Sequence, residues 1–392
     1  MRVFDYSVLK NYHWDSEILG LVAQIHEYKG RQELYLKQKP AALDKLIEIA
    51  KIQSTEASNK IEGIVTTSTR VQQLCMEKTT PRNRDEEEIM GYRDVLNTIH
   101  ESYKYIPIRS SYILQLHRDL YKYSEKAIGG RYKNTQNVIA ETRADGTRIV
   151  RFTSMAPYET PEAIEAICES FNQVVDSWVI DPLVLIPIFI NDFLCIHPFN
   201  DGNGRMSRLL TTLLLYRCGY LVGRYISIEN KIEKTKAKYY EVLEKSGVGW
   251  HEGNNDPTPF VKYILGIILA AYRDLDTRMN LLDEKLPAVE QVLNAVMQKI
   301  GKFTKSEIME LVPIGKASVE NSLKKLTEEG YIDRHGKGKA TFYTRKEPVA
   351  YGDLSKKQFD AEIEKGMIDV ENGKVHSSEE VMKEMKRDYD IE

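Results

Sequence analysis

The sequence predicts a mainly α-helical protein with one small β-hairpin and a C-terminal unit of mixed α and β structure. Three observations favour this class. Most segments carry apolar residues at helical spacing, and a single internal stretch has the short β-prone runs of a hairpin. From residue 286 the pattern changes to short helices followed by two strand-like runs. The chain has 392 residues, 42% of them hydrophobic, which predicts two or three domains and excludes disorder as the dominant state.

Four early segments carry the apolar periodicity of helices: residues 41–61, 85–103, 111–123 and 161–178. The first is followed by Gly63, a residue typical of a helix end. Between the third and fourth lies the predicted hairpin. There, residues 137–140 and 148–152 are β-prone and flank the turn pair Asp145-Gly146.

Two strongly apolar helices are expected in the middle of the chain. Asp181 is a good N-cap, and Pro182 follows it at the first helical position. The helix over residues 182–196 is apolar nearly all round, which predicts a central, buried position. The next helix, after Gly204, has an apolar face formed by Met206, Leu209, Leu210, Leu213 and Leu214.

The C-terminal unit is predicted to be a winged helix, since three helices precede a hairpin. Its second helix opens with a capping box from Thr304 to Glu307, and the tip of the hairpin is basic. The expected helices cover residues 289–300, a short segment after 304, and 316–329, and the expected strands cover residues 331–333 and 340–343. The chain then continues as an acidic tail after Pro348.

Composition excludes several classes of protein. Lys and Arg number 55 against 58 Asp and Glu, so a uniformly basic nucleic-acid binder is not indicated. The four cysteines are scattered, which argues against a disulfide framework and a thiolate zinc site. The start of the chain lacks the apolar core of a signal peptide, and residues 182–196 are too short and too polar to cross a bilayer. We therefore expect a cytoplasmic protein without membrane contact.

The segment from His197 to Arg208 concentrates the chemistry of the chain. Gly202 and Gly204 permit positive φ angles, so successive N–H groups can converge on an anion at the start of a helix. Arg205 and Arg208 are three residues apart and share a helical face. Two guanidinium groups beside such converging N–H groups predict a polyphosphate ligand.

Two further side chains complete the predicted site. Asp201 supplies a hard oxygen ligand suited to Mg²⁺ shared with phosphate. His197 can accept a proton near neutral pH. Taken singly, a histidine before Pro-Phe is an ordinary cap and Gly-Asn-Gly an ordinary turn, but their combination with two arginines and an acid favours phosphoryl or nucleotidyl transfer. The segment is not a Walker A loop.

This segment resembles the signature of the Fic family (filamentation induced by cAMP), His-x-Phe-x-Asp/Glu-Gly-Asn-Gly-Arg-x-x-Arg, at every constrained position. The likeness covers roughly residues 85–272 and implies an all-α core with a hairpin flap. It also implies transfer of AMP from ATP to a Tyr, Ser or Thr hydroxyl of a target protein. His197 would deprotonate that hydroxyl, and Phe199 would anchor the loop.

The resemblance further assigns the nucleotide contacts. Asp201 would hold Mg²⁺ between the α- and β-phosphates, and the segment Gly202–Gly204 would cradle the phosphates, with Asn203 on the α-phosphate. Arg205 would stabilise the leaving β-phosphate, and Arg208 would contact the γ-phosphate.

Three other stretches resemble family elements. The Asp145-Gly146 hairpin matches the flap, which adds a target backbone as a strand. Gly130 to Lys133 resembles Gly-x-Tyr-Arg, with lysine in place of the usual arginine. Tyr239 and Tyr240 resemble residues of a helix that lines the adenine pocket, while plain packing is the alternative interpretation.

The family resemblance also implies an inhibitory residue within the chain. Residues 58–63 resemble the inhibitory motif Ser/Thr-x-x-x-Glu-Gly/Asn, in which the glutamate, here Glu62, pairs with the second arginine, here Arg208. The pair would occupy the γ-phosphate position, so ATP would bind in an unproductive pose. The alternative is an ordinary surface glutamate. In some relatives the same glutamate helps to remove AMP, so the reverse reaction stays open.

The expected domains are residues 1–84 with the inhibitory helix, 85–283 as the catalytic domain, 284–346 as the winged helix, and 347–392 as the acidic tail. The expected function is an autoinhibited protein adenylyltransferase. The alternative is a nucleotide-sensing transcription regulator that binds DNA through the winged helix. Dimerisation or target docking through the winged helix, a homodimer, and a different nucleotide donor also stay open.

Overall fold

The computed structural model describes residues 2–346 apart from residues 39, 126–127, 143–147, 178, 281–286, 298, 300, 310, 313, 337 and 339–340. The Asp145-Gly146 turn, Lys337 and Lys339 of the basic tip, and the tail 347–392 therefore lie outside the described residues.

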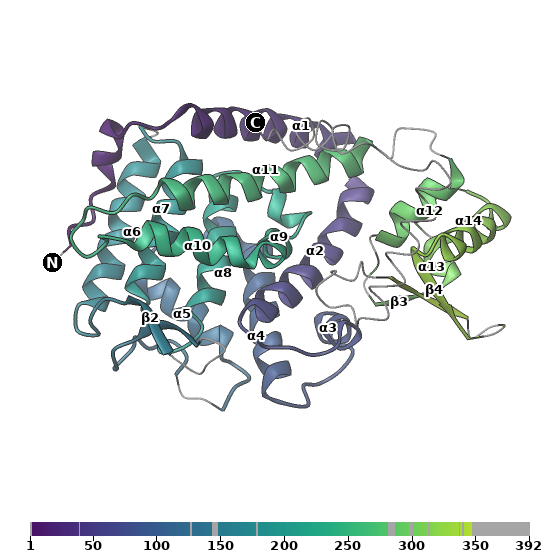
Figure 1. The fold of residues 1–392 in the computed structure, drawn as a ribbon, viewed down its shortest axis with the longest axis horizontal. Coiled ribbons are helices and arrows are strands. Elements are labelled where there is room, and N and C mark those ends of the chain that lie inside the picture. The colour runs from purple at the N-terminus through teal and green to yellow at the C-terminus, as the bar shows by residue number, and fades with distance from the viewer. Residues whose placement is uncertain are drawn as a thin grey trace, which may run out of the picture.

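The main body is an assembly of helices around one large hydrophobic core, which confirms the predicted fold class (Figure 1). The predicted helices are present with ends shifted by at most three residues, and a long N-terminal helix, α1, packs along α11. The elements of this body are η1 (Tyr6–Asn11), α1 (Ser16–Gln38), α2 (Pro40–Ile61), α3 (Ser68–Cys75), α4 (Arg84–Ser102), η2 (Tyr103–Tyr105), α5 (Ser110–Leu120), β1 (Val138–Thr142), β2 (Arg148–Thr153), α6 (Thr160–Ser177), α7 (Pro182–Ile196), α8 (Asn203–Arg217), η3 (Val222–Arg224), α9 (Ile228–Lys234), α10 (Lys236–Gly247) and α11 (Thr258–Asn280).

Helices α7 and α8 form the centre of this body. All residues of α7 are buried, as the all-round apolar pattern predicts, and the Asp181 carboxylate caps the helix by accepting a hydrogen bond from the Leu183 N–H at 2.8 Å. The polar face of α8 is buried too, because α2 and α4 pack against it. Both Arg205 and Arg208, which the sequence analysis places on one helical face, are consequently buried.

The predicted hairpin is present as β1 and β2, which pair antiparallel with Val138 opposite Thr153 and Thr142 opposite Arg148. Its base lies near the end of α7, since the Met155 N–H donates to the Cys195 carbonyl at 3.4 Å. The hairpin is thereby placed beside the α7–α8 loop.

The C-terminal unit has its own small core, formed by residues such as Val292, Phe303 and Leu323. The described residues of this unit form three helices and a three-stranded sheet of order β3-β5-β4. The predicted capping box is present, because the Thr304 N–H donates to Glu307 Oε2 at 2.7 Å. The third strand, β3, is absent from the sequence prediction because it has two residues. The elements are α12 (Ala288–Met297), β3 (Lys302–Phe303), α13 (Lys305–Met309), α14 (Lys316–Glu328), β4 (Ile332–His335) and β5 (Phe342–Arg345).

Among the described residues, no helix combines the length and the apolar character that crossing a membrane requires.

Candidate active site

The site is built on the loop between α7 and α8. His197 follows the last residue of α7 with φ 53° and ψ 63°, a left-handed conformation that ends the helix and is uncommon for residues other than glycine. Phe199 is fully buried, and its ring stacks on the ring of His117 with centroids 3.6 Å apart and planes 2° apart. The loop is therefore anchored in the core by an aromatic side chain, as predicted.

Asn203 closes the loop from the other side. Its Oδ1 accepts a hydrogen bond from the Phe199 N–H at 2.9 Å, and its Nδ2 donates to the Phe199 carbonyl at 2.7 Å. Both ends of the buried amide thus bind the loop backbone in this structure. The expected contact of Asn203 with an α-phosphate stays a prediction.

His117, which the sequence analysis missed, supports the same loop. Its Nδ1 accepts from the Gly130 N–H at 3.0 Å, so the ring proton lies on Nε2, which donates to the Asp201 carbonyl at 3.1 Å. Burial lowers the pKa of His117 to about 4, so the neutral form persists at neutral pH. Histidine in α5 carries no local pattern that links it to a loop 84 residues later.

The geometry of His197 fixes its tautomer. Its Nδ1 lies 3.2 Å from the Leu194 carbonyl, which can only accept a hydrogen bond, so Nδ1 carries the proton and Nε2 is left as an acceptor. Burial is the main cause that lowers the pKa of His197 to about 4, and the nearby ammonium of Lys133 acts in the same direction. The imidazole is neutral at pH 7 and able to accept a proton at Nε2.

Arg208 and Glu62 meet as the sequence predicts. Arg208 Nη2 lies 2.7 Å from Glu62 Oε1, and the guanidinium also donates to Ser58 through Nε to Oγ at 2.8 Å and Nη2 to the carbonyl at 2.9 Å. Burial alone would lower the pKa of Arg208, but the Glu62 carboxylate raises it overall. Ser58 lies in the last turn of α2 and Glu62 directly follows the helix, so both side chains reach Arg208.

The Glu62 carboxylate also lies against the first turn of α8. A Cβ placed on Gly204 would come within 2.1 Å of Glu62 Oε1, so this approach requires glycine at position 204. Gly202, with φ 85°, precedes the helix and has no side chain to cap it. An anion is favourable at a helix N-terminus, and Glu62 supplies one there.

Arg205 is enclosed more tightly than the sequence suggests. Its Nη2 lies 2.8 Å from Glu88 Oε2 and donates to the Tyr121 hydroxyl at 2.8 Å. Glu88 in turn accepts from Arg84 Nε at 2.8 Å. Within the described residues, Nε and Nη1 of Arg205 and Nη1 of Arg208 are buried donors without a hydrogen-bond partner. Such unfilled donors are suited to the oxygens of an anion.

Asp201 stands at the turn into α8, and its Oδ1 accepts from the Gly202 N–H at 2.8 Å. The described residues contain no group of three or more His, Cys, Asp and Glu side chains that could hold a metal ion. A single carboxylate fits an Mg²⁺ ion whose other ligands are phosphate oxygens and water, as is usual for Mg²⁺ with nucleotides.

Tyr239 and Tyr240, both on α10, lie within electrostatic range of the Arg208–Glu62 ion pair. Tyr239 is buried and packs against Tyr263, while Tyr240 is 42% exposed. Burial raises the pKa of both hydroxyls; the Glu62 carboxylate acts in the same direction, and the Arg208 guanidinium acts against it.

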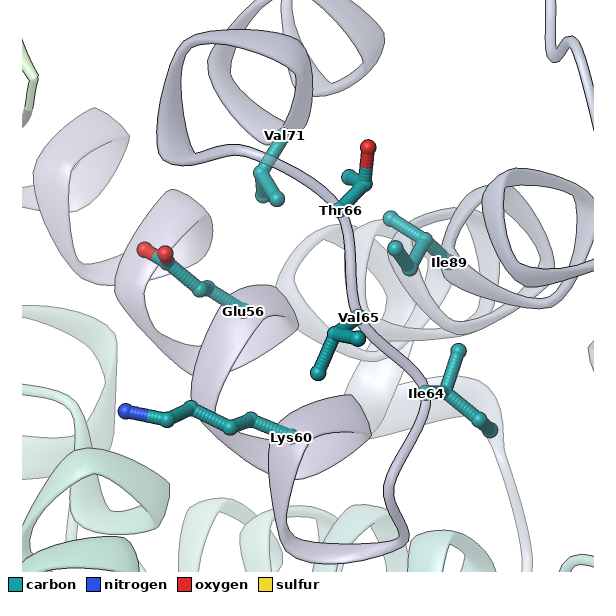
Figure 2. Close-up of a pocket in the computed structure, with 7 residues that line it drawn as sticks. All are labelled: Glu56, Lys60, Ile64, Val65, Thr66, Val71 and Ile89. Carbon is teal, nitrogen blue, oxygen red and sulfur yellow. The ribbon is translucent and has the colours of Figure 1, made fainter.

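A small cavity is lined by residues of α2, α3 and α4 and of the segment between α2 and α3. Figure 2 shows it between the end of α2 and the segment that leads into α3. Its volume of about 30 Å³ holds roughly one water molecule and is far too small for a nucleotide. It is lined by Glu56, Lys60, Ile64, Val65, Thr66, Val71 and Ile89.

Comparison with known proteins gives consistent matches. Residues 107–215 match the model of the Fic/DOC family. A Fido domain-containing protein of Dictyostelium discoideum is 33% identical over 98 residues, which are 23% of this chain and 68% of that protein. The protein adenylyltransferase fic-1 of Caenorhabditis elegans is 30% identical over 152 residues, or 39% of this chain and 25% of that protein.

The protein adenylyltransferase Fic of Nematostella vectensis is 25% identical over 236 residues, 57% of this chain and 48% of that protein. The chain thus spans between a quarter and about half the length of the first adenylyltransferases that it matches. Among solved structures, a Fic family protein from Desulfovibrio desulfuricans G20 superposes with a TM-score of 0.57 at 22% identity, over 86% of this chain and 98% of that one. This last likeness shows the fold.

Proposed function

The chain belongs to the Fic/DOC family, and on that basis we propose that it is a protein adenylyltransferase. It transfers AMP from ATP to a Tyr, Ser or Thr hydroxyl of a target protein or of its own chain. The observation that carries the proposal is the neutral His197 with an unprotonated Nε2, on the loop that leads into α8, the helix that carries the buried guanidinium groups. The names of the adenylyltransferase relatives support ATP as the substrate.

In the proposed reaction, Nε2 of His197 accepts the proton of the target hydroxyl. The hydroxyl oxygen attacks the α-phosphorus of ATP, the bond from that phosphorus to the bridging oxygen breaks, and pyrophosphate leaves. The backbone of Gly202–Gly204 and the guanidinium groups of Arg205 and Arg208 would bind the phosphates. Mg²⁺ at Asp201 would neutralise phosphate charge.

We further propose that Glu62 is an inhibitory residue. Its contacts with Arg208 and with the N-terminal turn of α8 support this, because they fill the place where anionic phosphate oxygens are expected. A nucleotide that enters with Glu62 in place would lose the Arg208 contact. Tyr239 and Tyr240 would form one wall of the adenine site.

The experiment that tests the proposal uses ATP labelled with ³²P at the α- or the γ-phosphate. We expect label from α-³²P-ATP, and none from γ-³²P-ATP, on a protein hydroxyl, identified as AMP by mass spectrometry. The His197→Ala variant should lose about 10²–10⁴-fold in rate. Label from the γ-position alone, or equal labelling by the His197→Ala variant, would contradict AMP transfer by this site.

For the C-terminal unit we propose a winged helix, which makes the DNA-binding regulator the second candidate. Arg334, Lys324 and Lys325 are exposed cationic side chains of the kind that DNA phosphates attract. However, Lys324 pairs with Glu328 at 3.7 Å and Lys325 with Glu329 at 3.6 Å, so much of this charge is balanced. A salt-sensitive gel shift without label transfer would favour the regulator.

A further inference from the structure

Lys133 is a buried ammonium group that the proposed reaction does not use. The residue is 3% exposed, and no carboxylate of the described residues forms a salt bridge with its Nζ. Burying a charge without a counter-ion is unfavourable, so other contacts must compensate it. Those contacts lead to His197.

Lys133 binds the carbonyl groups on both sides of His197. Its backbone N–H donates to the Pro198 carbonyl at 2.8 Å, and its Nζ donates to the Ile196 carbonyl at 2.8 Å. Ile196 is the last residue of α7, where the free carbonyl groups and the helix dipole favour a cation. The ammonium therefore stabilises the helix end at which His197 takes its left-handed conformation.

The same ammonium also reaches the base of the hairpin. Its Nζ donates to Ser154 Oγ at 2.8 Å, directly after β2. The Ser154 hydroxyl donates in turn to the Asn137 carbonyl at 2.9 Å, directly before β1. The Asn137 amide donates to the Phe199 carbonyl at 2.7 Å, which closes a ring of contacts between loop and hairpin.

We propose that Lys133 is a positioning residue that holds His197 in its reactive orientation and sets the hairpin at a fixed place relative to the imidazole. The inference rests on the proposed adenylyl transfer, in which the hairpin presents the target backbone to His197. Three bonds from one residue tie the proton acceptor to the element that aligns the hydroxyl. A displacement of about 1 Å between such groups can cost about 100-fold in rate.

Lys133 has an electrostatic effect as well. Three charged groups act on the imidazole besides its burial: Lys133 lowers the pKa of His197, while Glu62 and Asp201 raise it. Loss of the ammonium should therefore raise the pKa of His197.

The test compares Lys133→Met, which keeps the length of the side chain without charge or donors, with Lys133→Arg, which keeps both. Lys245→Met, at a 59%-exposed lysine of α10, is the matched control. For Lys133→Met we expect about a 100-fold lower kcat with little change in KM for ATP, and substantial rescue by arginine. A folded Lys133→Met variant with the kcat of the wild-type chain would overturn the proposal.

A second readout does not depend on transfer activity. In chains labelled at histidine and lysine, NMR titration should show a raised His197 pKa in Lys133→Met and an unchanged one in Lys245→Met. If the wild-type chain transfers no AMP while these shifts appear, the proposed function fails and the electrostatic coupling of Lys133 to His197 stands.

The wild-type chain alone provides a further measurement if Lys133→Met does not fold. Burial lowers the pKa of Lys133 to about 8, so its proton can be removed without a substitution. The His197 ring signals should move together with the Lys133 titration. His197 signals that stay fixed while Lys133 loses its proton would refute the coupling.

Discussion

Replacing Glu62 by glycine removes the carboxylate that contacts Arg208 at 2.7 Å and lies on the first turn of α8. Glu62 follows the end of α2, so the substitution does not interrupt a helix. The guanidinium of Arg208 keeps both hydrogen bonds to Ser58 and stays in place. We therefore expect a faster transfer of AMP without loss of the fold.

The size of the effect follows from the contact that is lost. A hydrogen bond between charged groups contributes about 1.5–3 kcal/mol, which corresponds to a rate increase of about 10- to 150-fold when the occluded form dominates. The Glu62 side chain is 31% exposed, so solvent screening favours the lower part of this range.

The assay measures initial rates of label incorporation from α-³²P-ATP at equal protein concentration. Glu77→Gly is a matched control, because Glu77 also follows a helix end and is 74% exposed, with Arg93 at 4.0 Å as its ion-pair partner. It should leave the rate unchanged. Thermal unfolding of all three chains verifies that the folded fraction is the same.

Equal rates for the wild-type chain and Glu62→Gly, with the His197→Ala variant inactive, would refute the inhibitory role of Glu62. A similar rate increase in Glu77→Gly would show that the effect does not come from the Arg208 contact. Absence of label in every chain would instead count against the transferase proposal.

Lys236→Ala removes the 2.7 Å bond from Nζ to the Ile61 carbonyl at the end of α2, so it should partly release Glu62 and raise the labelling rate less than Glu62→Gly. Phe199→Ala should lower the free energy of unfolding by about 3–5 kcal/mol in urea titrations, because the ring is fully buried. The pKa values of His197 and His117 are lowered to about 4 in the folded chain. The unfolded chain therefore binds more protons than the folded chain below its own histidine pKa of about 6.5. The urea midpoint should accordingly decrease as the pH falls from about 6.5 to about 4. A urea midpoint that is constant over this range would contradict the buried neutral state of these rings.

The order of helices, the hairpin and the functional loop could be predicted because each depends on local patterns. Gly202 and Gly204 indicate the turn before α8 directly, whereas residues 58–63 are singled out by their resemblance to the inhibitory motif. The contact between Glu62 and Arg208 is present as the family resemblance implies.

The partners of buried charges could not be predicted in this way. Arg205 binds Glu88 on α4 and Tyr121 after α5, residues far away in the sequence. Their proximity results from the packing of α4 against both α5 and α8, which no local periodicity encodes. The roles of Asn203 and Arg205 at a nucleotide accordingly stay predictions.

Glu62 is part of the same polypeptide as the site that it is proposed to inhibit, so the inhibition is intramolecular. A tethered carboxylate competes with a free anion at an effective concentration that the length and stiffness of the connecting chain determine. Dilution of the protein does not weaken it, in contrast to an inhibitor supplied by a separate molecule. The ATP concentration at which transfer begins would therefore be a property of each single molecule. A ligand or partner that binds or shifts the end of α2 would change that concentration.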